Sequence, residues 1–319
     1  MILCYDGGGS SSRMLLSDDD FNLIGEAHGL GVNQNHTPID EIRGSLRSCL
    51  EKTLNGRMLQ KGDEAFITVI GPVEELEALL LPYECLIRRM HEPLAALWAG
   101  VMRKYGFVAL SGTGSVVFYI DPERKRNKSF GGIGLLLGDE GSGAWIGQQA
   151  LKAVLNDLNG TEPATLMTKR AKESLGIQYP WDIIRKIYEA PSYVRYMAAF
   201  VPEAAIAAHE GDETALSLFR RAGEHLARQL LILYNRAEAH DDNRFCVLSG
   251  GVWKAHPLMF ETFCEKVHMQ VPDIIIKKPY FEPVLAGIVK KLSMREPSWT
   301  QEKRVEFLSE KFPGYVINY

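Results

Sequence analysis

The chain has 319 residues, 46% of them hydrophobic, and a net charge of −4. This composition is typical of a folded globular protein, and the length favours two lobes over one hydrophobic core. The small negative charge excludes the basic surface that nucleic acid or an anionic membrane attracts, and no apolar run is long enough to cross a bilayer.

The cysteines indicate a reducing compartment. They are scattered, odd in number and without a CxxC pair, which favours buried thiols over a disulfide framework or a zinc site. The five are Cys4, Cys49, Cys85, Cys246 and Cys264. The stretch before Asp6 is too short for a signal peptide, so we expect a cytoplasmic protein.

The first predicted elements are three strands joined by turns. The segments "MILCY" (1–5), "SSRMLLS" (11–17) and "FNLIGEA" (21–27) have strand patterns, and Asp18–Asp20 fit a hairpin turn better than a metal site. Because a strand rather than a helix follows "DGGGSSS", this is neither a dinucleotide-binding nor a Walker loop. The glycines predict a hairpin tip whose N–H groups surround an anion, or a tight turn without a ligand.

A helix is predicted over residues 37–56. Thr37 is the expected N-cap, Pro38 the first helical residue and Gly56 the terminator. One face of this helix is apolar, formed by Ile39, Ile42, Leu46 and Leu50.

Two further glycine turns occur along the chain, and the first of them repeats this design. The segment "FVALSGTGSVVFYI" (107–120) predicts two strands joined by a Gly-Thr-Gly tip. After a helix-rich stretch from Glu140 to His240, the strand "RFCVL" leads through "SGGVW" (249–253) into another helix. A glycine pair at such a turn allows a flat adenine to lie against the backbone. Three such turns in this order predict a nucleotide site.

The segment "GGIGLLLGDEGSGAWIGQQAL" (131–151) resembles the signature of the BadF/BadG/BcrA/BcrD ATPase family, which includes N-acetylglucosamine kinases of the sugar kinase/Hsp70/actin superfamily. "DGGGSSS" and "LSGTGS" resemble the two phosphate motifs of this family, and "LSGGVW" resembles its adenosine motif. The resemblance extends from residue 1 to about 292 and leaves the tail unmatched.

The resemblance implies an α/β fold of two actin-like (ribonuclease H-like) lobes with ATP in the interlobe cleft. The expected N-terminal lobe comprises residues 1–111, joined by roughly 293–319, and the C-terminal lobe comprises 112–292. A homodimer is implied as well.

The family also implies roles for individual residues. Asp6 is the expected Mg²⁺ carboxylate, acting through water. The residues expected at the phosphates of ATP are Gly8, Gly9, Ser10, Thr113 and Gly114, and those expected at adenosine are Gly250 and Gly251.

The catalytic base is expected at Glu92. In "MHEPLAAL", Glu92 replaces the family's Asp and His91 replaces the preceding Asn. Glutamate is one methylene longer, so the acceptor hydroxyl must lie further away or approach differently. The alternative is that Glu92 is only a first-turn carboxylate that the helix dipole favours, beside Pro93.

Three residues stand at sugar-binding positions of the family: Asn33, Gly132 and Asp139. Two neighbours depart from the pattern, because Ile133 replaces a Trp that lines the sugar site and Val116 replaces a polar residue. An aliphatic side chain offers neither the same stacking surface nor a hydrogen bond.

The predicted function is an ATP-dependent small-molecule kinase acting on a hydroxyl of an amino sugar such as N-acetylglucosamine or glucosamine. One alternative is an ATPase activator of a CoA-ester reductase or dehydratase. Such activators resemble dimers bridged by an iron–sulfur cluster, which needs two cysteines from each subunit. In this sequence only Cys85 lies near the expected place. The other alternative is a sensor that binds nucleotide and sugar without turnover.

Overall fold

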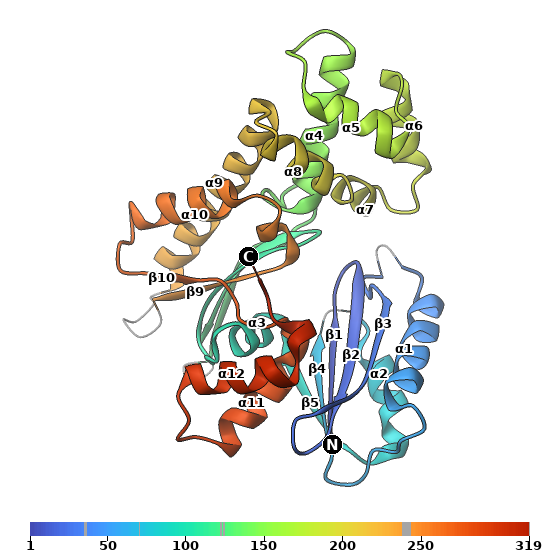
Figure 1. The fold of residues 1–319 in the computed structure, drawn as a ribbon, viewed down its shortest axis with the longest axis vertical. Helices are drawn as coiled ribbons and strands as arrows, with labels where there is room; N and C mark the ends of the chain where they lie inside the picture. Colours follow the sequence, from blue (N-terminus) through green and yellow to red (C-terminus); the bar gives the residue numbers. More distant parts are fainter. Residues whose placement is uncertain (35–36, 70, 122, 124, 238–243, 319) are drawn as a thin grey trace. The chain divides into compact units, whose positions relative to one another are not determined.

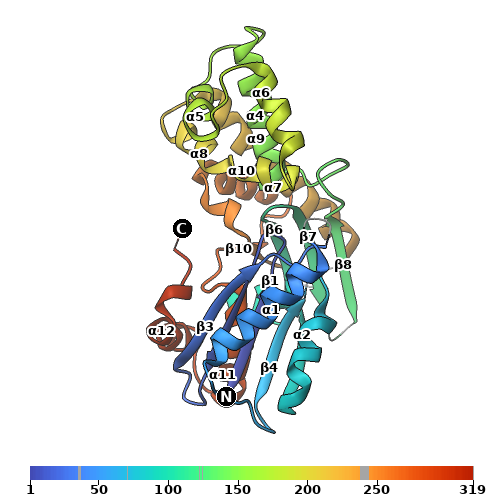
Figure 2. The same cartoon turned by 90° about the vertical axis from the view of Figure 1, so that its right-hand side faces the viewer.

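The computed structural model describes residues 1–319 except 35–36, 70, 122, 124, 238–243 and 319. The chain forms two compact units: unit 1 comprises Met1–Tyr105 with Lys277–Tyr319, and unit 2 comprises Gly106–Ile276. Each is an α/β unit built on a five-stranded sheet (Figures 1 and 2), which confirms the expected two-lobe fold class. No helix in the described part of the chain combines the length and apolar character needed to cross a membrane.

The sheet of unit 1 has the strand order β3-β2-β1-β4-β5. The first three strands form an antiparallel meander, and β4 and β5 extend it in parallel. The elements are β1 (Ile2–Gly7), β2 (Ser11–Ser17), β3 (Leu23–Leu30), α1 (Ile39–Leu54), β4 (Glu64–Val69), α2 (Val73–Leu80), η1 (Leu81–Tyr83), β5 (Leu86–His91), α3 (Glu92–Val101), η4 (Pro283–Leu285), α11 (Ala286–Arg295), α12 (Gln301–Lys311) and η5 (Pro313–Tyr315).

Alternation along β1 gives the sheet two buried faces. Leu3 and Tyr5 pack in the cluster that includes residues of α1 and α2. Ile2 and Cys4 point the other way, into a cluster with residues of α3, α11 and α12. Because successive side chains alternate, Asp6 lies on the same face as α3.

Unit 2 repeats this topology. Its sheet order is β8-β7-β6-β9-β10, with β6 in the central place that β1 occupies in unit 1 and a glycine turn leading into the antiparallel β7. The elements are β6 (Gly106–Ser111), β7 (Ser115–Asp121), β8 (Arg126–Gly131), α4 (Gly143–Leu158), α5 (Leu166–Leu175), α6 (Pro180–Glu189), α7 (Tyr193–Ala198), α8 (Val201–His209), α9 (Glu213–Ala237), β9 (Phe245–Ser249), η3 (Gly251–Lys254), α10 (Pro257–His268) and β10 (Ile275–Lys277).

The unit boundaries differ from the predicted divisions at 111 and 292. The chain enters unit 2 before β6, because β6 pairs with β7 and β9. It returns to unit 1 at Lys277, because η4 and α11 contribute Val284 and Ile288 to the core around β1.

The start of α1 also differs from its prediction. Pro38, rather than Thr37, is the N-cap, and it makes no side-chain cap hydrogen bond. At the other end, Asn55 takes the left-handed conformation just before Gly56.

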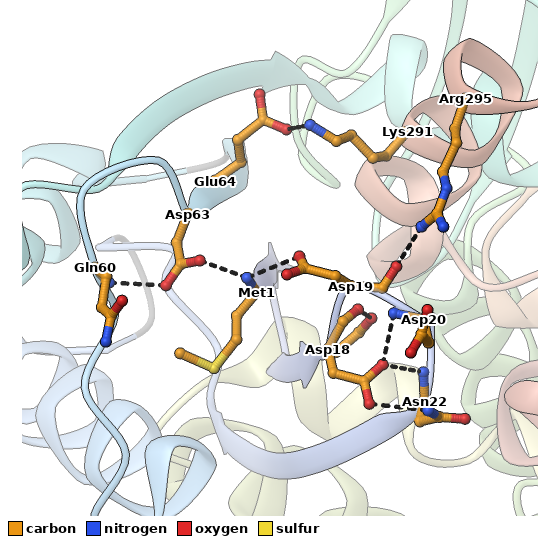
Figure 3. A network of polar contacts seen from close by, with 11 residues as sticks. Met1, Asp18, Asp19, Asp20, Asn22, Gln60, Asp63, Glu64, Lys291 and Arg295 are labelled. Atoms are coloured by element: carbon orange, nitrogen blue, oxygen red, sulfur yellow. Dashed lines mark hydrogen bonds and ion pairs between the residues drawn. The ribbon is translucent and has the colours of Figure 1, made fainter.

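A polar network closes the amino end of the unit 1 sheet (Figure 3). The N-terminal ammonium of Met1 contacts the carboxylates of Asp63 and Asp19. The Asp18 carboxylate accepts the backbone N–H groups of Asp20 and Asn22, at 3.0 and 2.8 Å. This confirms the predicted acidic turn, which lies at the opposite end of β1 from Asp6.

Candidate active site

Two carboxylates lie near the carboxyl edge of the unit 1 sheet. β1, β4 and β5 are parallel, with Asp6 in register with Thr68 and Thr68 in register with Met90. Glu92 follows β5 directly and is the first residue of α3, with Pro93 as the second. Because Asp6 faces α3, the two carboxylates are close enough to repel each other.

Both carboxyl groups are half-buried and hold their protons more tightly than usual. Burial, together with the negative charge of Asp6, raises the pKa of Glu92 to about 8. Burial also raises the pKa of Asp6 to about 6, and the Arg13 guanidinium opposes this shift. Since the two groups interact, these values describe the titration of the pair.

Arg13 is the cation of this cluster. It lies directly opposite Asp6 in the β1–β2 ladder and forms an ion pair with Glu282, which precedes η4. Glu282 is held in turn by the C-terminal segment, since its backbone N–H donates to the carbonyl of Tyr315 at 3.0 Å. The tail therefore helps to fix the groups around Asp6.

The first glycine turn closes tightly between β1 and β2. The N–H of Gly8 donates to the carbonyl of Ser11 at 2.9 Å, and the Gly8 carbonyl accepts the N–H of Val32 at 3.0 Å. A Cβ at Gly8 would lie 2.9 Å from that Ser11 oxygen, whereas one at Gly9 would meet nothing within 4 Å. The predicted hairpin tip is confirmed, with Gly9 half-buried and Ser10 exposed at its end.

The second glycine turn, Gly112–Gly114, is bonded to the start of α4. The carbonyls of Gly112 and Thr113 accept the N–H groups of Gly143 and Ala144, at 2.8 and 3.2 Å. The side chain of Ser111 donates to the carbonyl of Gly141 at 2.7 Å. These bonds join the turn to the "GDEGSG" segment (138–143).

The third turn packs directly on the second. Gly250 has a φ of +96°, and a Cβ there would lie 2.1 Å from the carbonyl oxygen of Ser111. Gly251 begins η3, and a Cβ there would meet nothing within 4 Å. Trp253 anchors the turn, since its buried indole N–H donates to the Ala109 carbonyl at 3.0 Å. The two glycines, equivalent in the sequence prediction, therefore have different constraints.

Asp139 lies beside the second turn. Its carboxylate accepts the N–H of Gly134 at 3.2 Å, and a Cβ on Gly114 would be 2.8 Å from its other oxygen. Burial raises the pKa of Asp139, while hydrogen bonds from the backbone of Gly134 and Ser115 oppose the shift. The predicted substrate residue and the predicted phosphate turn thus lie together.

The remaining predicted substrate residues are divided between the units. Gly132, with a φ of +71°, lies in unit 2 against Val116, and the neighbouring Ile133 is exposed. Asn33 is half-buried in unit 1, where its carbonyl accepts the N–H of Thr37 at 3.0 Å.

Sequence reasoning missed the side chains that support the site. Arg13 had one available signal, because a hairpin with a known tip places it across from Asp6. Glu282 and Ser111 had none, because their partners are separated from them by long stretches of chain.

The carboxylate pair predicts a pH-dependent stability. Both native pKa values lie above those of the unfolded chain. The contribution of these two groups to the free energy of unfolding is therefore fully present below about pH 4 and is lost as the pH rises through about 6 and then about 8. We expect Glu92→Gln to flatten the upper part of this decline. Melting temperatures between pH 5.5 and 9 measure it.

Glu74→Gln is the matched control, because Glu74 is also a first-turn acid of a helix but has an exposed side chain. It should keep the wild-type profile. Equal slopes for wild type and Glu92→Gln would contradict the raised pKa of Glu92.

The two glycines of the third turn predict different effects of the same substitution. Gly250→Ala should destabilise unit 2 by about 1–3 kcal/mol, because an L side chain at positive φ is strained and the new Cβ strikes the Ser111 carbonyl. Gly251→Ala should melt like wild type. Calorimetric melting of both variants measures the difference, and identical melting would mean that this packing is wrong.

The chain is similar to known proteins in sequence and in structure. An N-acetylmuramic acid/N-acetylglucosamine kinase of Clostridium acetobutylicum is 24% identical over 285 residues, which are 86% of this chain and 92% of that protein. An N-acetyl-D-glucosamine kinase of Dictyostelium discoideum is 25% identical over 210 residues, 65% of each chain. A solved Porphyromonas gingivalis structure, described as a candidate N-acetylglucosamine kinase, has the same fold, with a TM-score of 0.70 at 22% identity over 93% of this chain and 100% of that one.

A model of one family matches residues 5–286, from β1 through the three glycine turns to the first residue of α11. This match covers most of both units and confirms the resemblance drawn from the signature segment. The chain belongs to the BadF/BadG/BcrA/BcrD ATPase family.

Proposed function

We propose that the protein is an ATP-dependent sugar kinase that phosphorylates a hydroxyl of an amino sugar, with N-acetylglucosamine as the first candidate. The observation that carries the proposal is the Asp6–Glu92 pair at the carboxyl edge of unit 1, in a chain whose family and curated relatives include N-acetylglucosamine kinases. Phosphoryl transfer requires positioned phosphates, neutralised charge and a base at the attacking hydroxyl.

The glycine turns are assigned to the nucleotide. Gly8, Gly9 and Ser10 in unit 1, and Thr113 and Gly114 in unit 2, are assigned to phosphate oxygens, because glycine-rich turns allow backbone N–H groups to approach an anion closely. Gly250 and Gly251 are assigned to adenosine. The close packing of Gly250 on Ser111 supports a common role for the second and third turns.

Asp6 fits a magnesium ion that is held mainly by phosphate and water. It offers a half-buried carboxylate whose desolvation favours a nearby cation. Within the residues described, no group of three or more side chains could hold a metal by itself. This suits Mg²⁺, which keeps several waters and needs only one or two carboxylates. When bound, the ion supplies neutralisation of the phosphate charge.

Glu92 is assigned as the general base. A base works best when its pKa is near the working pH, and burial with the Asp6 charge raises the pKa of Glu92 to about 8. The alternative is that Glu92 is only a first-turn carboxylate that the helix dipole favours. That role requires neither burial nor a second carboxylate nearby. In the proposed mechanism Glu92 accepts the hydroxyl proton as the oxygen attacks the terminal phosphorus of ATP, and ADP leaves.

Asp139, Gly132 and Asn33 are assigned to the acceptor sugar. Asp139 has a buried, oriented carboxylate that can accept a hydrogen bond from a sugar hydroxyl. The aliphatic Ile133 follows Gly132 in the chain, and the aliphatic Val116 lies against Gly132. We therefore expect an acceptor preference that differs from that of relatives with polar or aromatic residues at these two positions.

We also propose that the protein is cytoplasmic. Five free cysteines support a reducing compartment and hence the cytoplasm. The homodimer implied by the family resemblance stays a prediction.

The test is ATP turnover with a panel of N-acetylglucosamine, N-acetylmuramic acid, glucosamine and glucose, for wild type and Glu92 variants. We expect Glu92→Gln to lower kcat by about 10²–10⁴-fold with little change in ATP affinity, because the base faces the acceptor. Glu92→Asp should retain partial activity, since it keeps the carboxylate but shortens its reach. Glu74→Gln, the exposed first-turn acid, should be fully active.

Three outcomes would contradict the proposal. A fully active Glu92→Gln enzyme would remove Glu92 as the base. ATP hydrolysis that no sugar stimulates would favour the activator function over the kinase. Binding of nucleotide and sugar without ADP release would favour the sensor.

A further inference from the structure

Gln229 is a polar residue on the buried face of the long helix α9. Its side chain is only 5% exposed, and its neighbours Leu226, Leu230 and Leu233 belong to the core of unit 2. Burying an amide is unfavourable unless its polar atoms are bonded, so a glutamine here needs a local reason.

The Gln229 amide contacts both ends of the segment 131–140. Its Nε2 donates to the carbonyl of Glu140 at 3.2 Å, and that carbonyl also accepts the Ser115 hydroxyl at 3.0 Å. Its Oε1 lies beside Gly131 at the other end, where a Cβ would be 2.8 Å away. Gly131 has a φ of +90°, so a side chain there is excluded by conformation as well as by space.

The segment between these ends contains two of the residues assigned to the sugar, Gly132 and Asp139. It is closed internally by the N–H of Gly138, which donates to the carbonyl of Gly134 at 2.9 Å, and by the Asp139 carboxylate on the Gly134 N–H. Most of the tip is exposed, but Leu135 is buried in the core of unit 2, so the loop is attached through this side chain as well as at its two ends. The attachment at Glu140 adjoins Asp139 directly.

The amide is not satisfied on both sides. Oε1 is buried and has no hydrogen-bond partner among the described residues. An apolar side chain of similar length would remove this unsatisfied oxygen, so glutamine is not the choice that maximises stability. The reason for a glutamine at this position is therefore the amide nitrogen, Nε2, which donates to the Glu140 carbonyl.

We propose that Gln229 is a positioning residue that fixes the loop 131–140 and thereby orients Asp139 toward the acceptor sugar. The kinetic part of this inference rests on the proposed function, whereas the structural part does not. Gln229 donates to Glu140 and lies against Gly131, and neither of these residues is assigned to the nucleotide, so its effect should fall on the sugar.

The experiment uses Gln229→Met, which keeps the length and removes both polar atoms, and Gln229→Glu, which cannot donate to the Glu140 carbonyl when ionised. Leu218→Ala is the control, because Leu218 is buried on the same helix but outside the loop contacts. For each protein, hydrogen exchange of peptides covering 131–140 is measured without ligand, together with melting temperature and the KM for sugar and for ATP.

We expect faster exchange over 131–140 in both Gln229 variants and a KM for N-acetylglucosamine raised about tenfold, because small misplacements of a binding group are costly. The KM for ATP should stay within about twofold. Gln229→Met should melt at or above the wild-type temperature, whereas Leu218→Ala should melt lower with both KM values unchanged.

Unchanged exchange over 131–140 would overturn the inference, as would equal changes in the two KM values or an effect that Leu218→Ala reproduces. If wild type phosphorylates no sugar, the proposed function fails, and the exchange and melting data still decide whether Gln229 fixes the loop.

Discussion

The burial of Asp6 and Glu92, together with their mutual repulsion, costs free energy that the fold of unit 1 must offset. The parallel strands bring both carboxylates to one edge of the sheet and away from water. The core formed by β1, α3 and α11 fixes both backbones, so the groups cannot move apart without unpacking it. Arg13 reduces the charge, and Glu282 and the tail at Tyr315 hold Arg13 in place. An arrangement that is unfavourable for stability in this way is characteristic of sites selected for chemistry.

Unit 2 meets a different requirement, which is rigidity of the backbone. Its second and third glycine turns have no side chains at the positions where main chain must approach main chain, as at Gly250 on Ser111. Hydrogen bonds from the start of α4 to Gly112 and Thr113 tie the turns to the segment that carries Asp139. The two units thus use the same strand order for different purposes: unit 1 concentrates charge, and unit 2 fixes loops.

Much of this structure could be predicted from the sequence, because its signals are local. Apolar strand patterns on both sides of each glycine tip predicted the two hairpins, and the position of Glu92 before Pro93 predicted the start of α3. The unit boundaries could not be predicted, since they depend on which distant strand pairs with β6. Gln229 gave no signal either, because a glutamine in an amphipathic helix usually faces solvent, and only tertiary packing places this one against Glu140.

Glu92 should titrate far above an ordinary glutamate because it is buried beside Asp6. Carbon-13 NMR of side-chain carboxyls in glutamate-labelled protein measures this directly, with the Glu92 signal identified by its loss in Glu92→Gln. We predict a midpoint near 8 in the free protein, which shifts downward in Asp6→Asn because the neighbouring charge is gone. A midpoint near 4.5, or one that Asp6→Asn leaves unchanged, would contradict it.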